Sequence, residues 1–404
     1  MTSFDSSPQL NVWRMLLALA VVFVMLATTG WTAVRTHRGA SPLEASLSAW
    51  ERGHLNGHKL PDPDASAGYI AHFFASITSA QRTRLAQRYP LAVGNMNGAP
   101  VQLRYRANRI ALEQQRRTER ERMRDERVSP VGQQLAGRRM HRYEDLLDDG
   151  RQILSFDPMG SGRVAEVFGD LDKAKRVSVV VPGVDTDLLS FQRTNRPYSA
   201  PVGMARALYD EERAAGPSVP TAVIAWADYT TPSGLGMDAA TAMRADDGAV
   251  RLNGLVQGLP GRSPVALYCH SYGSVVCGVA AHALPSRVRD IAVAGSPGMR
   301  AERVAGLRTK ARVWAMRDAS DWIQDVPHLE FGGLGHGADP VSSGFGARLL
   351  SSDGAQGHAG YFTPGTTSLR NLAAIGVGAY RAVACAKDDA CRTGLPGAVA
   401  AGRA

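Results

Sequence analysis

The stretch "YCHSYGSVVCG", residues 268–278, decides the fold class of this chain. The run "PVALYCH" is short and apolar, as in a strand buried on both faces, and "SYGSVVCGVAAHAL" is typical of a helix. A serine on a tight turn from strand to helix matches the nucleophile pattern G-x-S-x-G. Gly273 follows Ser271 at the expected spacing, whereas Cys269 replaces the first glycine. Because serine also caps helices at such junctions, the motif alone leaves both roles open for Ser271.

Short apolar runs alternate with helical segments from Arg151 onward. "RQILSF" and "RVAEVFGDL", joined by "DPMGSG", predict a hairpin. "RVSVVVPG", "TAVIAWADY", "VRDIAVAGSPG" and "ARVWAMRD" predict further buried strands, with helices around 202–214, 239–255 and 368–380 between or after them. This alternation predicts an α/β fold in which helices flank a mostly parallel central sheet.

A nucleophilic serine on such a sheet needs an acid and a histidine, each placed after a later strand. The predicted strand "ARVWAM" is followed by "RDASDWI", which offers Asp318 and Asp321. Asp321 is the first choice because the neighbouring Trp322 and Ile323 can pack and hold the loop. Asp318 remains the alternative.

His358 is the candidate general base. It lies in "SDGAQGHAGYFTPG", after the predicted last strand "FGARLLSSD" and before the last helix. His328 and His336 precede that strand, which makes them weaker candidates. Together with Asp339 they could be read as metal ligands, but loop histidines more often face solvent, so we expect no metal and no organic cofactor.

Two backbone N–H groups are expected to form an oxyanion hole, which stabilises the charge of a tetrahedral intermediate. One belongs to Tyr272, directly after the serine. The other is assigned to Val184 in "VVVPGVDTDLLSF", where Gly183 permits a sharp turn after a strand. The "TTPSGLGMD" loop and the Gly-rich region 324–346 are expected to form the rim of the pocket.

The uncharged run "MLLALAVVFVMLATTGWTAV", Met15–Val34, is long enough to cross a bilayer. We interpret it as an uncleaved anchor; a cleaved export signal and a buried core helix are the alternatives. Arginines on both sides leave the orientation weakly specified. We place the large C-terminal part outside the cytoplasm, on a single-pass anchor in the cell membrane, with secretion as the alternative.

The 404 residues, 44% of them hydrophobic and 21% charged, are sufficient for a large globular core. Arginine outnumbers acidic residues by more than two to one in the segment 102–142, so the net charge of +9 lies mainly there. Within it, "RANRIALEQQRRTERERMRDER", residues 106–127, predicts a long solvated helix, which either packs on the next domain or binds an anionic surface; a nucleic-acid partner is not expected. The predicted boundaries are an N-terminal tail at 1–12, a transmembrane or signal-anchor helix at 13–34, a linker at 35–66, a helical arm at 67–150, the α/β domain at 151–384 and a C-terminal tail at 385–404.

The four cysteines fall into two pairs by position. Cys385 and Cys391 are spaced for a small exposed disulfide if the domain lies outside the cytoplasm. Cys269 and Cys277 are expected on buried elements, as free thiols that behave like small apolar residues.

Many separate motifs resemble one family. "FFASITSAQRTRLAQRYPLAVGNMNG", "RANR", "RQILSFDPMGSGRVAEVFGDL", "VSVVVPGVDTDL", "AVIAWADYTTP", "HSYGS", "VAGSPGM" and "GHAGYFTPGTTSLRNLA" are similar to the α/β-hydrolase family catalogued as domain of unknown function 1023. The likeness covers roughly residues 70–380. It implies an α/β-hydrolase fold with Ser271, Asp321 and His358 as the catalytic triad. In that family the nucleophile elbow, which is the tight turn that carries the serine between strand and helix, usually reads G-H-S-Y-G-S. This chain departs from that pattern at Cys269.

These patterns together predict a membrane-tethered serine hydrolase that cleaves an ester, lipid esters included, through an acyl-enzyme. The expected partners are a small-molecule or lipid ester and the membrane, through the N-terminal helix. The alternative is a non-catalytic envelope scaffold or binding protein that retains the fold. Neither the identity of the substrate nor the oligomeric state follows from the sequence.

Overall fold

The structure is a computed structural model that describes residues 41–387 and 389–395. The predicted N-terminal tail and membrane helix, 1–34, lie outside the described residues, as do 388 and 396–404. From Pro42 onward the described chain packs as one compact unit. Among the described residues, no helix combines the length and the apolar character needed to span a bilayer.

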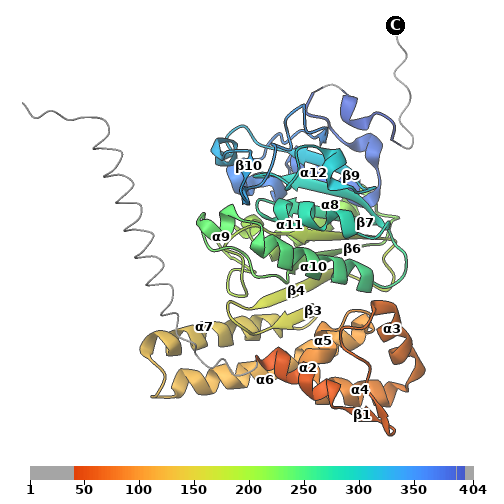
Figure 1. Ribbon diagram of the computed structural model, residues 1–404, viewed down its shortest axis with the longest axis vertical. Helices are drawn as coiled ribbons and strands as arrows, with labels where there is room; N and C mark the ends of the chain where they lie inside the picture. The colour runs from red at the N-terminus through yellow and green to blue at the C-terminus, as the bar shows by residue number, and fades with distance from the viewer. Residues whose placement is uncertain (1–40, 388, 396–404) are drawn as a thin grey trace, which may run out of the picture. The chain divides into compact units, whose positions relative to one another are not determined.

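An eight-stranded sheet forms the centre of the described chain, in the order β12-β9-β8-β7-β5-β6-β4-β3 (Figure 1). The strands are β3 (Gln152–Asp157), β4 (Arg163–Gly169), β5 (Arg176–Val181), β6 (Thr221–Ala227), β7 (Val265–His270), β8 (Val288–Ala294), β9 (Arg312–Met316) and β12 (Arg348–Leu349). The strands from β12 to β6 run parallel, and β4 and β3 continue the sheet antiparallel. The mostly parallel sheet and the β3–β4 hairpin therefore match the sequence prediction.

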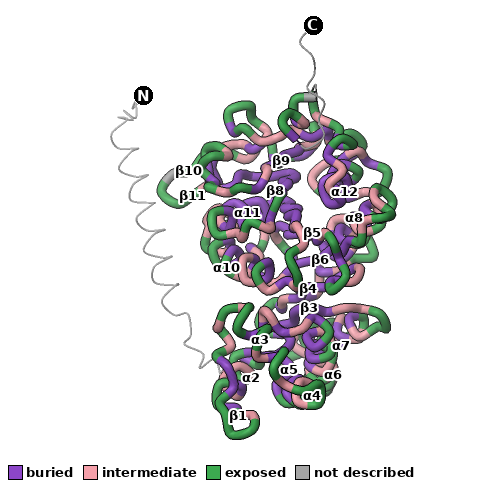
Figure 2. The backbone as a smooth tube through the Cα atoms, turned by 90° about the vertical axis from the view of Figure 1, so that its right-hand side faces the viewer, coloured by how far each residue is buried: buried purple, intermediate pink, exposed green. Residues whose placement is uncertain are grey.

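Helices cover both faces of this sheet. The helices are α8 (Pro201–Ala215) and α12 (Thr367–Val377) on one face, and α10 (Met243–Gly258) and α11 (Gly273–Ala280) on the other. Strand β6 is buried along its whole length, and its side chains alternate between the two cores. Val223 and Ala225 enter the core under α8, whereas Ile224 and Trp226 enter the core under α10. Figure 2 shows the central strands as buried, whereas α8 and α10 carry exposed residues on their outer faces.

The helical arm covers the free edge of the sheet. It contains α3 (Ala67–Ser76), α4 (Ser79–Arg88), α5 (Pro90–Asn95), α6 (Val101–Arg124) and α7 (Pro130–Leu146). Asn95 accepts a hydrogen bond from the Phe156 N–H (3.1 Å) and donates one to the Phe156 carbonyl (2.8 Å) on edge strand β3. Asn108 on α6 donates to the Ile153 carbonyl at 2.9 Å. Because these amides pair with the exposed strand edge, the arm docks on the sheet.

Part of the predicted linker is instead a folded element of the arm. Residues 42–59 form α2 (Pro42–Glu51) and a hairpin of β1 (His54–Leu55) and β2 (His58–Lys59). Trp50 is fully buried against Phe74 and Tyr89, and its Nε1–H donates to the Pro61 carbonyl at 2.7 Å. The linker prediction was wrong here because one buried indole anchors a segment whose composition is otherwise polar.

The predicted C-terminal tail also begins as ordered structure. Cys385 and Cys391 form the expected disulfide, and Cys385 pairs with Leu350 in a bridge beside β12. Cys391 and Leu395 are buried in the core under α12. The boundary at 384 is therefore corrected, since the chain as far as 395 packs on the sheet.

A buried carboxyl group on α8 predicts a pH dependence of stability. Burial raises the pKa of Glu212 from 4.5 to about 8, and Ser178 donates a hydrogen bond to it. The folded chain then keeps a proton that the unfolded chain releases, so this stabilisation is complete below pH 4.5 and is lost as the pH rises to about 8. The slope is at most about 1.4 kcal/mol per pH unit.

Glu212→Gln is expected to flatten this decline, since the amide mimics the neutral carboxyl group. Denaturant unfolding at about pH 5 and about pH 8 measures the free energy of unfolding of both proteins. The variant should gain stability relative to wild type at the higher pH. The partly exposed neighbour Glu211→Gln is the control, with parallel curves expected. Parallel curves for Glu212→Gln as well would contradict the prediction.

Candidate active site

Ser271 occupies the turn between β7 and α11 with a positive φ of 55°. An L-residue rarely adopts this conformation, which is concentrated at functional sites. The Ser271 N–H is held by the Ala294 carbonyl of β8 at 3.1 Å. Gly273 lies where a Cβ would come within 2.3 Å of the Val181 carbonyl oxygen, so only glycine lets α11 approach β5 this closely.

Cys269 and Cys277 form a disulfide across this turn. Both side chains are buried, at the end of β7 and within α11. The prediction of free thiols was wrong because the strand-turn-helix geometry brings their Cα atoms to 6.5 Å, within the range for a disulfide. A spacing of eight residues in the sequence does not reveal that proximity.

The structure brings Ser271, His358 and Asp321 together in one hydrogen-bonded chain. His358 Nε2 lies 2.8 Å from Ser271 Oγ, and His358 Nδ1 lies 2.8 Å from Asp321 Oδ1 and 3.1 Å from Oδ2. Since a carboxylate only accepts, Nδ1 carries the proton and Nε2 is free to accept the Ser271 hydroxyl hydrogen. Asp321 is the N-cap of η4 (Trp322–Asp325) after β9, and His358 lies in η5 (Gly357–Phe362). These are the roles that a nucleophile, a general base and an orienting acid require.

The geometry distinguishes the two candidate aspartates. Asp321, not Asp318, is the hydrogen-bond partner of the imidazole, and Asp318 Oδ1 instead accepts hydrogen bonds from the N–H groups of Gly357 (2.9 Å) and Ser320 (3.1 Å). It therefore fastens the loop that carries His358. Among the other histidines, His328 donates to the Pro297 carbonyl and His336 to the Ala239 carbonyl, so neither takes the place of His358.

Tyr361 is a partner of the aspartate that sequence reasoning missed. Its hydroxyl donates to Asp321 Oδ2 at 2.5 Å and accepts the Asp318 N–H at 3.0 Å. Burial alone would raise the pKa of Asp321, but hydrogen bonds from His358, Tyr361 and the Ile323 N–H together hold it below its usual value. The carboxylate thus stays ionised at neutral pH. The only signal in the sequence is an aromatic residue three positions after the histidine.

Tyr361→Phe is expected to lower kcat of the hydrolase proposed below about tenfold, because a hydrogen bond to a charged group contributes roughly 1.5–3 kcal/mol. Tyr380→Phe is a matched control. The Tyr380 hydroxyl likewise donates to a buried carboxylate, that of Asp290, at 2.8 Å. This second Tyr–Asp pair includes neither Ser271 nor His358. Steady-state kinetics and thermal unfolding on both variants test this: Tyr380→Phe should lose stability and keep kcat, and the same result for Tyr361→Phe would contradict the prediction.

Aromatic rings enclose the His358 imidazole. The His270 ring centroid lies 4.8 Å away and that of Trp322 4.7 Å away. Burial lowers the pKa of His270 to about 3, so this ring is neutral, and its Nε2–H donates to the His358 carbonyl at 2.6 Å. Gly295, at φ +57°, completes the site, since a Cβ there would come within 2.6 Å of Asp321 Oδ2.

The predicted oxyanion turn lies against the serine. A Cβ on Gly183 would come within 2.6 Å of Ser271 Cβ and 3.2 Å of the Tyr272 nitrogen. The backbone of this turn therefore packs directly against Ser271 and Tyr272. Tyr229 holds this turn through a 2.7 Å hydrogen bond to the Pro182 carbonyl. Within the described residues, the N–H groups of Tyr272 and Val184 donate to no backbone or side-chain acceptor. Both are therefore free to bind a ligand oxygen.

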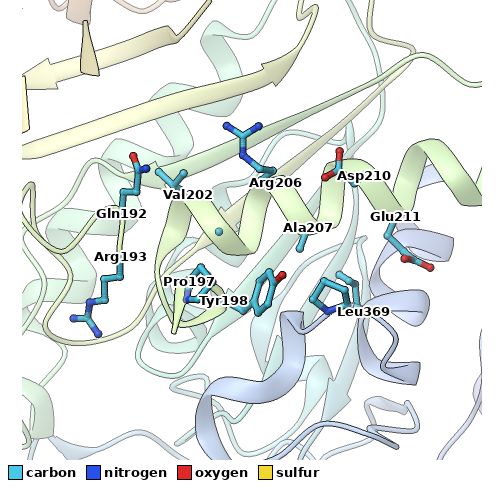
Figure 3. A pocket seen from close by; sticks show the side chains of 12 residues that line it. Gln192, Arg193, Pro197, Tyr198, Val202, Arg206, Ala207, Asp210, Glu211 and Leu369 are labelled. Atoms are coloured by element: carbon cyan, nitrogen blue, oxygen red, sulfur yellow. The ribbon is translucent and has the colours of Figure 1, made fainter. Parts of the chain in front are cut away.

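A cavity of about 450 Å³ lies elsewhere, along α8 (Figure 3). Tyr198, Arg206 and Leu369 are among its lining residues, and none of the three residues of the Ser271 chain is. It lies on the face of the sheet covered by α8 and α12, and we treat it as separate from the candidate active site.

Part of the chain matches the model of a known family. Residues 157–331 match the model of a family described as "Alpha/beta hydrolase". The uncharacterized protein Rv2079 of Mycobacterium tuberculosis (strain ATCC 25618 / H37Rv) is 29% identical over 378 residues, 79% of this chain and 57% of that protein. The uncharacterized protein Mb0988c of Mycobacterium bovis (strain ATCC BAA-935 / AF2122/97) is 30% identical over 205 residues, 49% of this chain and 72% of that protein. This chain thus spans little more than half the length of the first of these relatives.

Two solved structures are weakly similar. Dienelactone hydrolase from Anabaena variabilis ATCC 29413 has a TM-score of 0.29 at 18% identity, covering 41% of this chain and 72% of that one. XC6422 from Xanthomonas campestris, described as an a/b serine hydrolase without lid, has a TM-score of 0.27 at 13% identity, covering 44% of this chain and 74% of that one. The family assignment rests instead on the family model and on the Mycobacterium bovis relative, which this chain covers over most of its length. The chain belongs to the alpha/beta hydrolase family.

Proposed function

We propose that this protein is a serine hydrolase that cleaves carboxylic esters through an acyl-enzyme. The observation that carries the proposal is the 2.8 Å contact between His358 Nε2 and the hydroxyl of a serine held at positive φ. A serine that served only as a helix cap would need neither this backbone conformation nor a histidine backed by a buried carboxylate. The wider resemblance also favours membership of the family catalogued as domain of unknown function 1023.

The proposed reaction has two halves. His358 removes the proton from Ser271 Oγ, which attacks the ester carbonyl, while the N–H groups of Tyr272 and Val184 bind the oxyanion. The protonated imidazole, stabilised by Asp321, then gives its proton to the leaving alcohol as the C–O bond breaks. Water, deprotonated by the same imidazole, attacks the acyl-enzyme and releases the acid, which returns Ser271 to its hydroxyl form.

We also propose that the hydrolase acts outside the cytoplasm, tethered by residues 13–34. Two features support this: the uncharged run Met15–Val34 and the two disulfides, which persist in oxidising compartments. Lipid esters are the favoured substrates because an anchored enzyme works beside lipid.

Labelling with a fluorophosphonate tests the proposed chemistry. Attack by an activated serine forms an Oγ–P bond and expels fluoride, and mass spectrometry of the digested protein identifies the modified residue. We expect modification of Ser271 together with turnover of short p-nitrophenyl esters. A folded protein that is not labelled and hydrolyses no ester would refute the proposal and favour the non-catalytic scaffold.

A further inference from the structure

Six large apolar side chains are exposed in two segments beside the candidate active site. They are Leu235, Met237, Met243, Trp322, Leu329 and Leu334, with exposed fractions of 69, 68, 71, 40, 57 and 45%; we call these six residues the apolar rim. The remaining exposed large apolar residues in the described part of the chain are spread over α3, α7, α10 and the β3–β4 turn. Concentrated exposure of this kind marks a binding surface.

The two segments of the apolar rim are joined to each other. One contains α9 (Met237–Ala240), and the other contains the hairpin of β10 (Glu330–Phe331) and β11 (Leu334–Gly335). Thr241 and Leu334 form an antiparallel bridge, and His336 Nε2–H donates to the Ala239 carbonyl at 2.7 Å. In Figure 1, α9 and β10 project on the same side of the sheet. The two segments therefore lie side by side.

This surface is hydrogen-bonded to Tyr272 and to Asp185, the residue after Val184. The Tyr272 hydroxyl donates to the Thr241 carbonyl at 2.8 Å, and burial raises the pKa of Tyr272 to about 12, so the hydroxyl remains a donor. On the other side, Asp185 follows Val184; its N–H donates to the Pro232 carbonyl (2.9 Å), and its carboxylate accepts the Gly234 N–H (2.8 Å). The segment 232–241 thus contacts one candidate oxyanion residue, Tyr272, and the residue next to the other, Val184.

Two ion pairs flank the apolar rim: Arg244 binds Asp238 at 2.9 Å, and Arg300 binds Glu330 at 2.7 Å. Asp325, between Trp322 and Leu329, adds an exposed carboxylate. Paired arginines and an exposed carboxylate provide no attraction for an anionic headgroup at this edge. The rim therefore complements an uncharged hydrocarbon, and its methionine side chains adapt readily to flexible chains.

We propose that the apolar rim binds the hydrocarbon chain of a long-chain ester while the ester group lies at Ser271. The proposal rests on the serine-hydrolase function above and specifies its substrate class. The rim residues leave water when the chain binds, so affinity rises with chain length. Because 232–241 bonds to the oxyanion turn, the bound chain lies next to the reacting carbonyl.

Esters of different chain length test this. The variant is Leu235→Ser/Met237→Ser, and the control is Val131→Ser on α7, whose side chain is 76% exposed. The substrates are p-nitrophenyl acetate and p-nitrophenyl decanoate, the latter below its critical micelle concentration. We expect kcat/KM for decanoate to fall at least about tenfold in the rim variant and kcat/KM for acetate to stay within about twofold. The control should keep both values.

Each outcome has a distinct meaning. Equal losses of kcat/KM on both esters, or no loss on decanoate, would overturn the proposal. A loss that appears only when decanoate is dispersed in neutral phospholipid vesicles would also overturn it, because it would indicate docking on the lipid surface instead. A folded wild-type protein that is not labelled at Ser271 and hydrolyses neither ester would overturn the proposed function itself. The rate of labelling by fluorophosphonates with short and long alkyl chains repeats the test without turnover.

A separate observation concerns the Cys269–Cys277 disulfide. It closes a short loop that contains Ser271, Tyr272 and Gly273, and it ties the end of β7 to α11. The Ser274 hydroxyl adds a hydrogen bond to the Cys269 carbonyl at 3.1 Å. We infer that this disulfide positions the nucleophile: it limits separation of strand and helix, and thereby holds Ser271 in its unfavourable backbone conformation.

The chain offers its own control for this inference. Cys269→Ala/Cys277→Ala is expected to lower kcat and the fluorophosphonate labelling rate about tenfold with KM nearly unchanged, since misplacement of a nucleophile slows the chemical step. Cys385→Ala/Cys391→Ala removes the other disulfide and should alter only thermal stability. Normal labelling in the first variant would overturn the inference. If that variant does not fold, labelling of the wild type after reduction by a phosphine, with thiols counted by mass spectrometry, decides in the same way.

Discussion

Ser271→Ala is expected to lower kcat/KM for p-nitrophenyl acetate by at least about 10⁴-fold, because the proposed acyl-enzyme can no longer form. The oxyanion N–H groups would remain in place, so residual activity above the uncatalysed rate is expected. The loss should appear without a matching loss of stability, since the side chain removed is one hydroxyl that accepts no backbone hydrogen bond in this turn. Steady-state kinetics with freshly purified variant, together with thermal unfolding, measure both quantities.

Ser274→Ala is the matched control for this variant. Ser274 is buried three residues later, and its hydroxyl donates only within the elbow, to the Cys269 carbonyl at 3.1 Å. Its removal should cost about 1 kcal/mol of stability and leave kcat/KM within severalfold of wild type. Comparable kinetics for the two variants would show that Ser271 is not the nucleophile.

Asp321→Asn is expected to lower kcat by about 10³ to 10⁴-fold. Asparagine occupies the same volume, but its amide group can donate to His358 Nδ1 and so favour the tautomer in which Nε2 carries the proton. That tautomer cannot accept the Ser271 proton. The lowered pKa of Asp321, which its hydrogen bonds produce despite burial, means that the wild-type carboxylate stays ionised through the neutral range. The loss should therefore persist across a kcat profile from about pH 6 to about pH 9.

Asp318→Asn provides the comparison that the sequence itself suggests. Asparagine keeps an Oδ1 acceptor for the Gly357 and Ser320 N–H groups, so the His358 loop should remain fastened. We expect a loss of less than about tenfold. A larger effect at Asp318 than at Asp321 would reverse the assignment of the orienting acid.

Local sequence predicted much of the site because its parts depend on local chemistry. The elbow needs an apolar strand, a serine and Gly273, and all three lie within ten residues. The histidine was identified by its place after the last strand, since neighbouring strands of a parallel sheet present their following loops at one edge. Tyr361 and the role of His270 did not emerge, because an aromatic ring in a loop and a histidine in a strand are equally consistent with plain core packing.

The sequence by itself determined the α/β class, the strand-turn-helix around Ser271 and the order of serine, acid and histidine, since these follow from the periodicity of apolar residues and from turn chemistry. Only the tertiary structure decided that Asp321 rather than Asp318 faces His358 and that Cys269 pairs with Cys277. It also showed that Trp50 makes a folded element of the expected linker and that 232–241 contacts Tyr272 and Asp185, which follows Val184. Each of these depends on distances between segments remote in the chain or on side-chain direction, and packing of the whole core sets both.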